Sequence, residues 1–159
     1  MAYVDGNMSG RVVGDFGTGN GILSVGAILL GAEKVFAYDA DPDMVLLARE
    51  NTKDMAVEVV LSEIGKVMGR FDTVLMNPPW GDSASNLDRA FMLKASETSG
   101  HLYAIHNIRS MDYLKNFYSQ LGKVEQIVRV ALDMPRIYRH HTRDMSRIEG
   151  VMFSVSFNR

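Results

Sequence analysis

An asparagine, two prolines and a tryptophan in succession form the stretch of this sequence best suited to chemistry. They are Asn77, Pro78, Pro79 and Trp80, and they follow an apolar run, residues 71–76, that is typical of a buried parallel strand. Proline cannot donate a hydrogen bond to a neighbouring strand, so the strand must end here with the asparagine held extended. An amide, two rigid rings and a large aromatic ring would suit a site that binds a flat molecule carrying an amino group. The alternative is a strand-ending turn in which Trp80 anchors the core.

A glycine-rich turn, residues 15–21 (Asp-Phe-Gly-Thr-Gly-Asn-Gly), lies where a predicted first strand meets a predicted first helix. Glycines permit positive φ and close backbone approach, so a ligand can lie against the main chain at the start of a helix. Ile22 occupies the last glycine position of the dinucleotide fingerprint, which argues against a nicotinamide cofactor. Asp15 also disfavours a pyrophosphate, whereas it could orient the loop or attract an ammonium group.

Asp39 ends the predicted second strand, at about the interval where an acid binds ribose hydroxyls. A carboxylate accepts hydrogen bonds from both hydroxyls of a vicinal diol, which is the physical reason for an acid at this place. Taken singly, the glycine turn could serve tight packing and Asp39 could be a solvated turn residue. Together with the stretch around Asn77, they favour a nucleoside-like ligand without a pyrophosphate, such as S-adenosylmethionine.

The elements that must position these residues alternate between strands and helices. Strands are predicted at residues 10–16, 34–38, 56–61, 71–76, 101–106, 124–132 and 151–157, and helices at 21–31, from Pro42 onward, at 87–99 and at 110–121. Such alternation predicts an α/β fold with a doubly wound, Rossmann-like, mostly parallel sheet of seven strands. The last two strands lack a crossover helix between them and are expected to form an antiparallel hairpin.

Size and composition predict a single domain over residues 1–159. The formal charge is −2, so contact with nucleic acid would need a local basic patch or a partner. The absence of cysteine excludes disulfides and thiolate catalysis. No apolar run is long enough to span a membrane and no signal peptide is evident, so a cytoplasmic protein is expected. No metal site is expected either, because His140 and His141 lack further ligands nearby.

These motifs resemble the class I methyltransferases, and more narrowly the archaeal and eukaryotic small-subunit ribosomal RNA adenine-N6 methyltransferases (methyltransferase-like protein 5 and its archaeal relatives). The resemblance extends from Val12 to Phe157. The stretches that carry it are residues 15–21, 36–41, 71–81 and 90–91, and the end from Asp133-Met134-Pro135 to the last strand. The glycine loop marks only the superfamily, whereas Asn-Pro-Pro-aromatic implies methylation of a nitrogen attached to a planar system. The resemblance therefore implies S-adenosylmethionine as cofactor and ribosomal RNA as substrate.

The resemblance also assigns expected roles to single residues. Asp15, Gly17 and Gly19 would line the methionine end of the cofactor, Asp39 would hold its ribose, and Glu63 stands where the family usually has an aspartate for the adenine amino group. The residues expected to bind the cofactor are Asp15, Phe16, Gly17, Thr18, Gly19, Gly21, Asp39, Ala40, Glu63 and Asn77, and those expected to act on the acceptor are Asn77, Pro78, Pro79 and Trp80.

Two surfaces are candidates for partners. The only basic concentration contains Arg136, Arg139, His140, Arg143 and Arg147, in the connection before the last strand, where it could contact RNA phosphates or simply be solvated. The third strand, residues 56–61, is expected at a sheet edge and is apolar. The resemblance implies that a small zinc-binding activator subunit pairs there. The alternative is an edge covered by its own flanking loops.

The expected activity is thus adenine-N6 methylation of small-subunit ribosomal RNA. Guanine N2, cytosine N4 and protein glutamine stay open as acceptors, and so does a catalytically weak RNA-binding or scaffold relative. The family normally has several tens of residues before the glycine loop, including a segment that covers the cofactor, whereas only Met1 to Gly14 precede Asp15 here. Either the chain is truncated or its cofactor site is more open than in the family.

Overall fold

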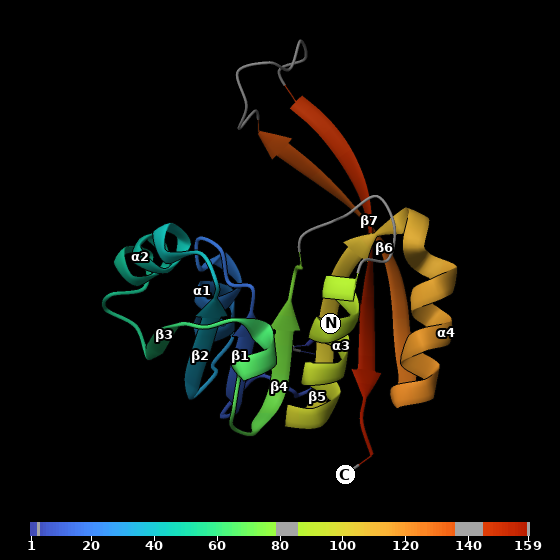
Figure 1. Ribbon diagram of the computed structural model, residues 1–159, viewed down its shortest axis with the longest axis horizontal. Helices are drawn as coiled ribbons and strands as arrows, with labels where there is room; N and C mark the ends of the chain where they lie inside the picture. Colours follow the sequence, from blue (N-terminus) through green and yellow to red (C-terminus); the bar gives the residue numbers. More distant parts are fainter. Residues whose placement is uncertain (3, 79–85, 136–144, 159) are drawn as a thin grey trace.

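The computed structural model describes residues 1–2, 4–78, 86–135 and 145–158 (Figure 1). Within these ranges there are seven strands, four α-helices and two short 3₁₀ turns, and strands alternate with helices as far as β6. Their bounds are β1 Val12–Phe16, α1 Ile22–Leu29, β2 Lys34–Asp39, α2 Pro42–Asn51, β3 Val57–Leu61, η1 Ile64–Lys66, β4 Phe71–Met76, α3 Asn86–Thr98, β5 Ser99–Asn107, η2 Ile108–Ser110, α4 Met111–Leu121, β6 Lys123–Pro135 and β7 Met145–Ser156.

The seven strands form one sheet in the order β3-β2-β1-β4-β5-β7-β6. The first five strands are parallel, whereas β7 is antiparallel to both β5 and β6. The predicted fold class, with its antiparallel last pair, is confirmed. The prediction that the third strand is an edge is also confirmed, because β3 pairs only with β2 within the described sheet.

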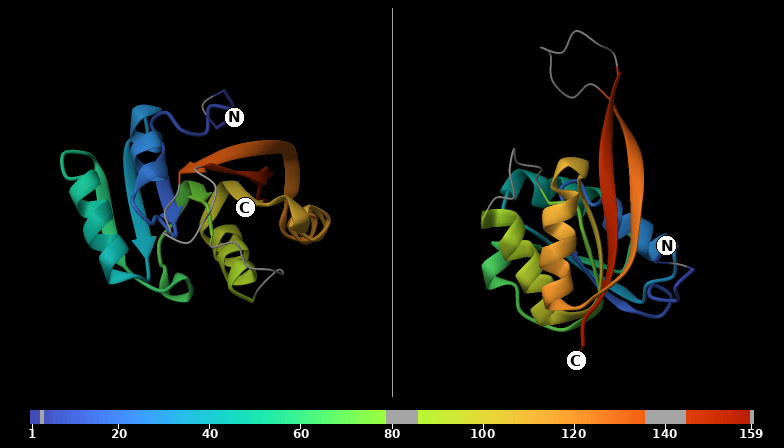
Figure 2. Two further views of the ribbon diagram at one scale, coloured as in Figure 1. Left: turned by 90° about the horizontal axis from the view of Figure 1, so that it is seen from above. Right: turned by 90° about the vertical axis from the view of Figure 1, so that its right-hand side faces the viewer.

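Helices cover the sheet in two layers, with α1 and α2 on one side and α3 and α4 on the other (Figure 2). The larger core lies under α3 and α4, where Phe91 of α3 and Tyr118 of α4 pack with the buried residues of β4, β5 and β7. Phe16, Tyr38 and Phe71 meet edge to face within this core, with ring centroids 5.7–6.1 Å apart.

Local signals for the first two helices behave as expected. α1 ends before Gly31, whose φ of +91° a residue with a side chain rarely adopts. α2 starts at Pro42, and the Asp41 side chain accepts a hydrogen bond from the Asp43 backbone N–H at 2.8 Å. Asp41 is therefore the N-cap of α2, in agreement with a helix predicted from Pro42 onward.

The predicted ends of the later strands were wrong in two places. β6 and β7 form a long hairpin that extends beyond the body of the sheet, so part of the supposed connection is strand (Figures 1 and 2). Arg147 lies within β7, in register with Asp133 of β6, and not in the connection. The fifth strand, predicted at residues 101–106, is longer at both ends, so that His101 and His106 lie inside β5.

No helix among the described residues is long and apolar enough to cross a membrane.

Candidate active site

The sheet order reverses between β1 and β4, the two strands that carry the glycine loop and Asn77. β3 and β2 lie to one side of this point, and β5, β7 and β6 lie to the other. Phe16, the last residue of β1, is in register with Met76, the last residue of β4. The glycine loop and Asn77 therefore leave adjacent strands at the same level. In open α/β sheets, ligands bind at the carboxyl edge where the strand order reverses.

The backbone of the glycine loop requires glycine at three positions. Gly17, Gly19 and Gly21 have φ values of +72°, +55° and +85°, a region that residues with a side chain rarely adopt. The loop is fixed to β2, because the backbone N–H groups of Gly17 and Thr18 both donate to the Tyr38 carbonyl, at 2.9 and 3.0 Å. Its conformation is therefore set by the fold before any ligand arrives.

Asp39 links the glycine loop to the start of α2. Its Oδ2 accepts from the Gly19 backbone N–H at 2.8 Å and its Oδ1 accepts from the Asp41 backbone N–H at 3.0 Å. Each carboxylate oxygen has two lone pairs, so both can accept one further hydrogen bond. The carboxylate is thus oriented by the backbone and still able to bind a ligand's hydroxyl groups.

Asp15 lies buried beneath the glycine loop and not on its surface. Its Oδ2 accepts hydrogen bonds from Ser24 Oγ at 2.6 Å and Thr18 Oγ1 at 2.7 Å, and the residue is fully shielded from solvent. Burial raises the pKa of the Asp15 carboxyl, and the hydrogen bonds from Ser24 and Thr18 oppose that rise. Oδ1 has no hydrogen-bond partner among the described residues. In this conformation Asp15 braces the loop from below.

A cavity of about 750 Å³ opens where these segments meet. Its size falls in the range of small-molecule sites, roughly 300–1,000 Å³. Its lining includes three acidic residues (Asp39, Asp41 and Glu63) and several apolar ones, so the cavity suits a ligand with a flat apolar part, hydroxyls and positive charge. The lining residues are Gly17, Tyr38, Asp39, Ala40, Asp41, Met44, Ser62, Glu63, Ile64, Gly65, Asn77 and Phe91.

Asn77 and Pro78 directly follow β4, at the carboxyl end of the adjacent strands β1 and β4. Asn77 is exposed and lines the cavity, whereas Pro78 is buried. Thus one residue of the acceptor motif reaches the same cavity as the glycine loop and Asp39. An amide next to a cavity of this character could hold the amino group of a second molecule beside a bound nucleoside.

Comparison with known proteins assigns the family. The family model for ribosomal protein L11 methyltransferase (PrmA) matches residues 3–77. A solved protein of Thermoplasma acidophilum is 44% identical over 99% of this chain and 84% of its own, with a TM-score of 0.84. A candidate RNA methyltransferase of Pyrococcus horikoshii is 31% identical over 99% of this chain and 80% of its own, with a TM-score of 0.89. The METTL5 rRNA N6-adenosine-methyltransferase of Danio rerio is 29% identical over 86% of this chain and 71% of its own length.

The chain belongs to the family of METTL5 and its archaeal relatives, within the class I methyltransferases. It is an S-adenosylmethionine-dependent methyltransferase.

In this methyltransferase some of the expected cofactor residues line the cavity and the others lie in or under the glycine loop beside it. Gly17, Asp39, Ala40, Glu63 and Asn77 all line the cavity. The remaining expected cofactor residues support the loop: Asp15 is covered, Phe16 packs in the aromatic core, Thr18 is bonded to Asp15, Gly19 is bonded to Asp39, and Gly21 is the N-cap of α1.

Sequence reasoning missed several lining residues of the methyltransferase cavity. Met44 comes from the first turn of α2, and Ser62, Ile64 and Gly65 come from the turn η1 and the link that precedes it. Met44 and Ile64 supply the apolar part of the cavity. The helix start at Asp41-Pro42 is a sequence signal that places Met44 in the first turn of a helix. The turn η1 is too short to give a periodic signal, so its residues could not be found in this way.

Part of the predicted site lies outside the described residues. These are Pro79 and Trp80 of the acceptor motif and Arg136, Arg139, His140 and Arg143 of the basic cluster. Arg147 is placed only as a backbone position in β7. Their expected roles stay predictions from the sequence.

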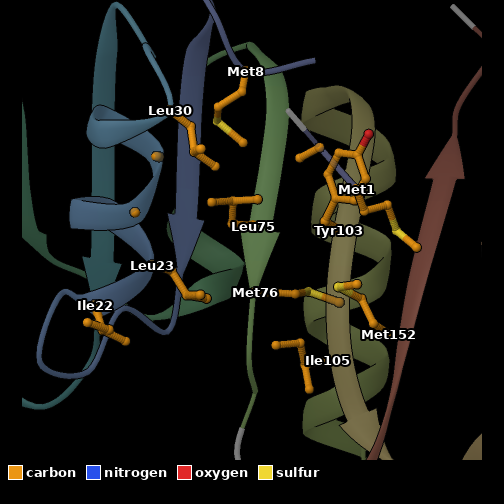
Figure 3. A pocket seen from close by; sticks show the side chains of 13 residues that line it. Met1, Met8, Ile22, Leu23, Leu30, Leu75, Met76, Tyr103, Ile105 and Met152 are labelled. Atoms are coloured by element: carbon orange, nitrogen blue, oxygen red, sulfur yellow. The ribbon is translucent and has the colours of Figure 1, made fainter. Parts of the chain in front are cut away.

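A second cavity, of about 220 Å³, lies between α1 and the sheet and differs in character (Figure 3). Leu23 of α1, Leu75 of β4 and Met152 of β7 point into it, and the described residues that line it include no acid and no base. The Tyr103 hydroxyl is already engaged, because it donates to Asp5 Oδ2 at 2.8 Å. This cavity therefore lacks the polar groups that a charged nucleoside requires.

Proposed function

We propose that this methyltransferase transfers a methyl group from S-adenosylmethionine to N6 of an adenine in small-subunit ribosomal RNA. The observation that carries the proposal is the position of Asn77, which leaves β4 level with the glycine loop and lines the same acidic cavity. The relationship to METTL5 supports adenine as the acceptor base.

The cavity residues fit S-adenosylmethionine by their chemistry. In the proposed arrangement, Asp39 accepts hydrogen bonds from the ribose hydroxyls through lone pairs that its backbone contacts leave available. Met44 and Ile64 pack against the adenine ring, and Glu63 accepts from the adenine amino group. Glu63 pairs with Lys66 at 3.2 Å on the surface, so its carboxylate is near the rim of the cavity. The acidic lining favours a sulfonium and an ammonium group and disfavours a pyrophosphate.

The acceptor half of the site has to make a poor nucleophile reactive. The lone pair on the exocyclic nitrogen of adenine is delocalised into the ring. In the proposed mechanism the Asn77 side-chain carbonyl and the Pro78 backbone carbonyl accept hydrogen bonds from the two N–H groups of the adenine amino group. These bonds favour a pyramidal nitrogen whose lone pair points toward the methyl group to be transferred. The cofactor supplies an electrophilic methyl group on a positively charged sulfur. After transfer the methylated nitrogen would lose its extra proton to water, so no dedicated base is needed, and positioning and charge complementarity account for most of the catalysis.

The target base must leave any helix to reach Asn77. The sequence prediction that Trp80 stacks on this base is part of the proposal, as is phosphate contact by the arginines of residues 136–147. The match to the L11 methyltransferase model ends at residue 77, so it supports the cofactor half of the site and says little about the acceptor.

We also propose that β3 receives the small zinc-binding activator subunit. β3 is an edge strand, and Leu61 at its end has 54% of its surface exposed. An unpaired, partly apolar edge can accept an additional strand from a partner.

The test is transfer of labelled methyl to ribosomal RNA by the wild-type chain and Asn77→Ala, with and without the activator. Asn77→Ala should reduce transfer about a hundredfold or more, because one catalytic hydrogen bond contributes on that order. S-adenosylmethionine binding by calorimetry should be largely retained. Asn158→Ala, at an exposed position near the C-terminus, is the matched control. Near-normal transfer by Asn77→Ala would overturn the role given to this residue.

A further inference from the structure

Two aromatic side chains of α4 lie stacked on each other, one exposed and one partly buried. The rings of Tyr113 and Phe117 are one helical turn apart, with centroids 5.9 Å apart and planes inclined by 21°. The Arg89 guanidinium, from α3, lies 5.3 Å from the centre of the Phe117 ring. Tyr113 has 42% of its surface exposed. Two helices thus contribute to one exposed cluster of flat groups.

The cluster is only partly buried, because Phe117 packs against the border of the larger core whereas Tyr113 is exposed. The adjoining side of α4 buries Leu114 and Tyr118, which anchor the helix to the sheet. Stacking of Tyr113 on Phe117 stabilises the helix slightly, as neighbouring side chains one turn apart do. That contribution does not explain why the Tyr113 ring remains exposed to solvent, or why the Arg89 guanidinium of α3 lies against Phe117 of α4.

The cluster lies at the edge of the sheet where the acceptor site opens. α3 begins directly after residues 79–85, the segment that follows the acceptor asparagine, and Arg89 is in its first turn. α4 begins after β5, the strand next to β4, and Tyr113 is in its first turn. Both helices start at the carboxyl edge and run side by side away from it (Figures 1 and 2).

The local charge is compatible with a polyanion. Among the described residues at the starts of α3 and α4, Arg89, Arg109 and Asp112 are exposed, while Asp88 is buried. Flat rings next to guanidinium groups are the combination that binds unpaired bases, because the ring stacks on the base and the cation attracts its phosphate.

We propose that Tyr113, Phe117 and Arg89 form a stacking platform for an unpaired base of the substrate RNA, next to the nucleotide being methylated. The inference rests on the proposed function, since it gives the RNA a path from Asn77 across the starts of α3 and α4. The base stacks on the exposed face of Tyr113, Phe117 holds that ring in place, and Arg89 contacts the adjoining phosphate. The platform selects single-stranded RNA and tolerates different bases.

The kinetic test compares Tyr113→Ala with Tyr113→Phe, which keeps the ring. Tyr113→Ala should raise KM for RNA about tenfold, the scale expected for one stacked base, with KM for S-adenosylmethionine unchanged. Tyr113→Phe should behave like the wild type. Arg89→Ala should reduce the slope of log KM against log salt by about one. Lys115→Ala, an exposed charge further round α4, is the matched control.

A binding test separates this inference from the proposed function. The probe is a single-stranded RNA carrying 2-aminopurine, whose fluorescence falls when the base stacks. The wild type should quench it, and Tyr113→Ala should lose the quenching. Wild-type transfer to RNA with equal KM and equal quenching in Tyr113→Ala would overturn the platform while the proposed function stands. Quenching that depends on Tyr113, in a chain that methylates no RNA, would support the platform and contradict the proposed function.

Discussion

Replacing Asp39 by asparagine tests the cofactor half of the site, because both carboxylate oxygens already have defined partners. Oδ2 accepts from Gly19 N at 2.8 Å and Oδ1 accepts from Asp41 N at 3.0 Å. An amide has only one acceptor oxygen, so one backbone N–H must face an NH₂ group instead. The substitution keeps size and shape and removes one charged acceptor.

The expected loss follows from the strength of such bonds. A hydrogen bond to a charged group contributes about 1.5–3 kcal/mol, and its loss corresponds to a roughly 10- to 150-fold rise in Kd for S-adenosylmethionine. Titration calorimetry of the wild type and Asp39→Asn measures this difference directly. Thermal unfolding of both proteins shows how much of the loss comes from a loosened glycine loop.

The matched control is Glu58→Gln, another change of acid to amide. Glu58 pairs with Lys34 at 2.8 Å on the surface of β3 and lines neither cavity. The affinity of the Glu58→Gln protein for S-adenosylmethionine should stay within twofold of the wild type. If Asp39→Asn also bound the cofactor within twofold of the wild type, the assignment of Asp39 to the ribose would be refuted.

Two further predictions concern stability. His106 is buried with Nε2 2.8 Å from Tyr118 Oη, and burial lowers its pKa from 6.5 to about 4. As the pH falls, His106 takes up a proton near pH 6.5 in the unfolded chain but only near pH 4 in the folded one. Lowering the pH from about 7 to 5 should therefore reduce the free energy of unfolding by roughly 2 kcal/mol. Urea unfolding should show a smaller loss for His106→Gln, and equal losses would contradict the shift. Gly122→Ala would place a methyl group against the Ser156 carbonyl oxygen and should cost about 1–3 kcal/mol. In Gly26→Ala the added methyl would meet no atom within 4 Å, so this change within α1 should instead stabilise by about 0.5–1 kcal/mol. Chemical unfolding that ranked the two variants the other way would refute this packing argument.

Much of the architecture was predictable because it depends on local patterns. Apolar runs indicated the strands in order, and capping residues such as Asp41 and Pro42 indicated where helices start. The end of the strand at Asn77 followed from the prolines. The level of Asn77 and the glycine loop could be inferred because parallel strands end at a common edge. The likeness to METTL5 then confirmed the family.

The remainder depends on contacts between distant parts of the chain. The far ends of β6 and β7 pair with each other beyond the body of the sheet, a pairing that no local pattern signals, and both strands were predicted too short. The burial of Asp15 and its hydrogen bonds to Thr18 and Ser24 have no signal in the sequence, and its expected role at the cofactor stays a prediction. The approach of Arg89 to Phe117 joins two helices and has no signal in sequence spacing.

Identification of the methylated nucleoside tests the central claim most directly. Small-subunit ribosomal RNA incubated with the protein and labelled S-adenosylmethionine would be digested to nucleosides and analysed by mass spectrometry. The proposed function predicts label in N6-methyladenosine, and its loss with Asn77→Ala. Label in N2-methylguanosine, in N4-methylcytidine or in a protein fraction would contradict it.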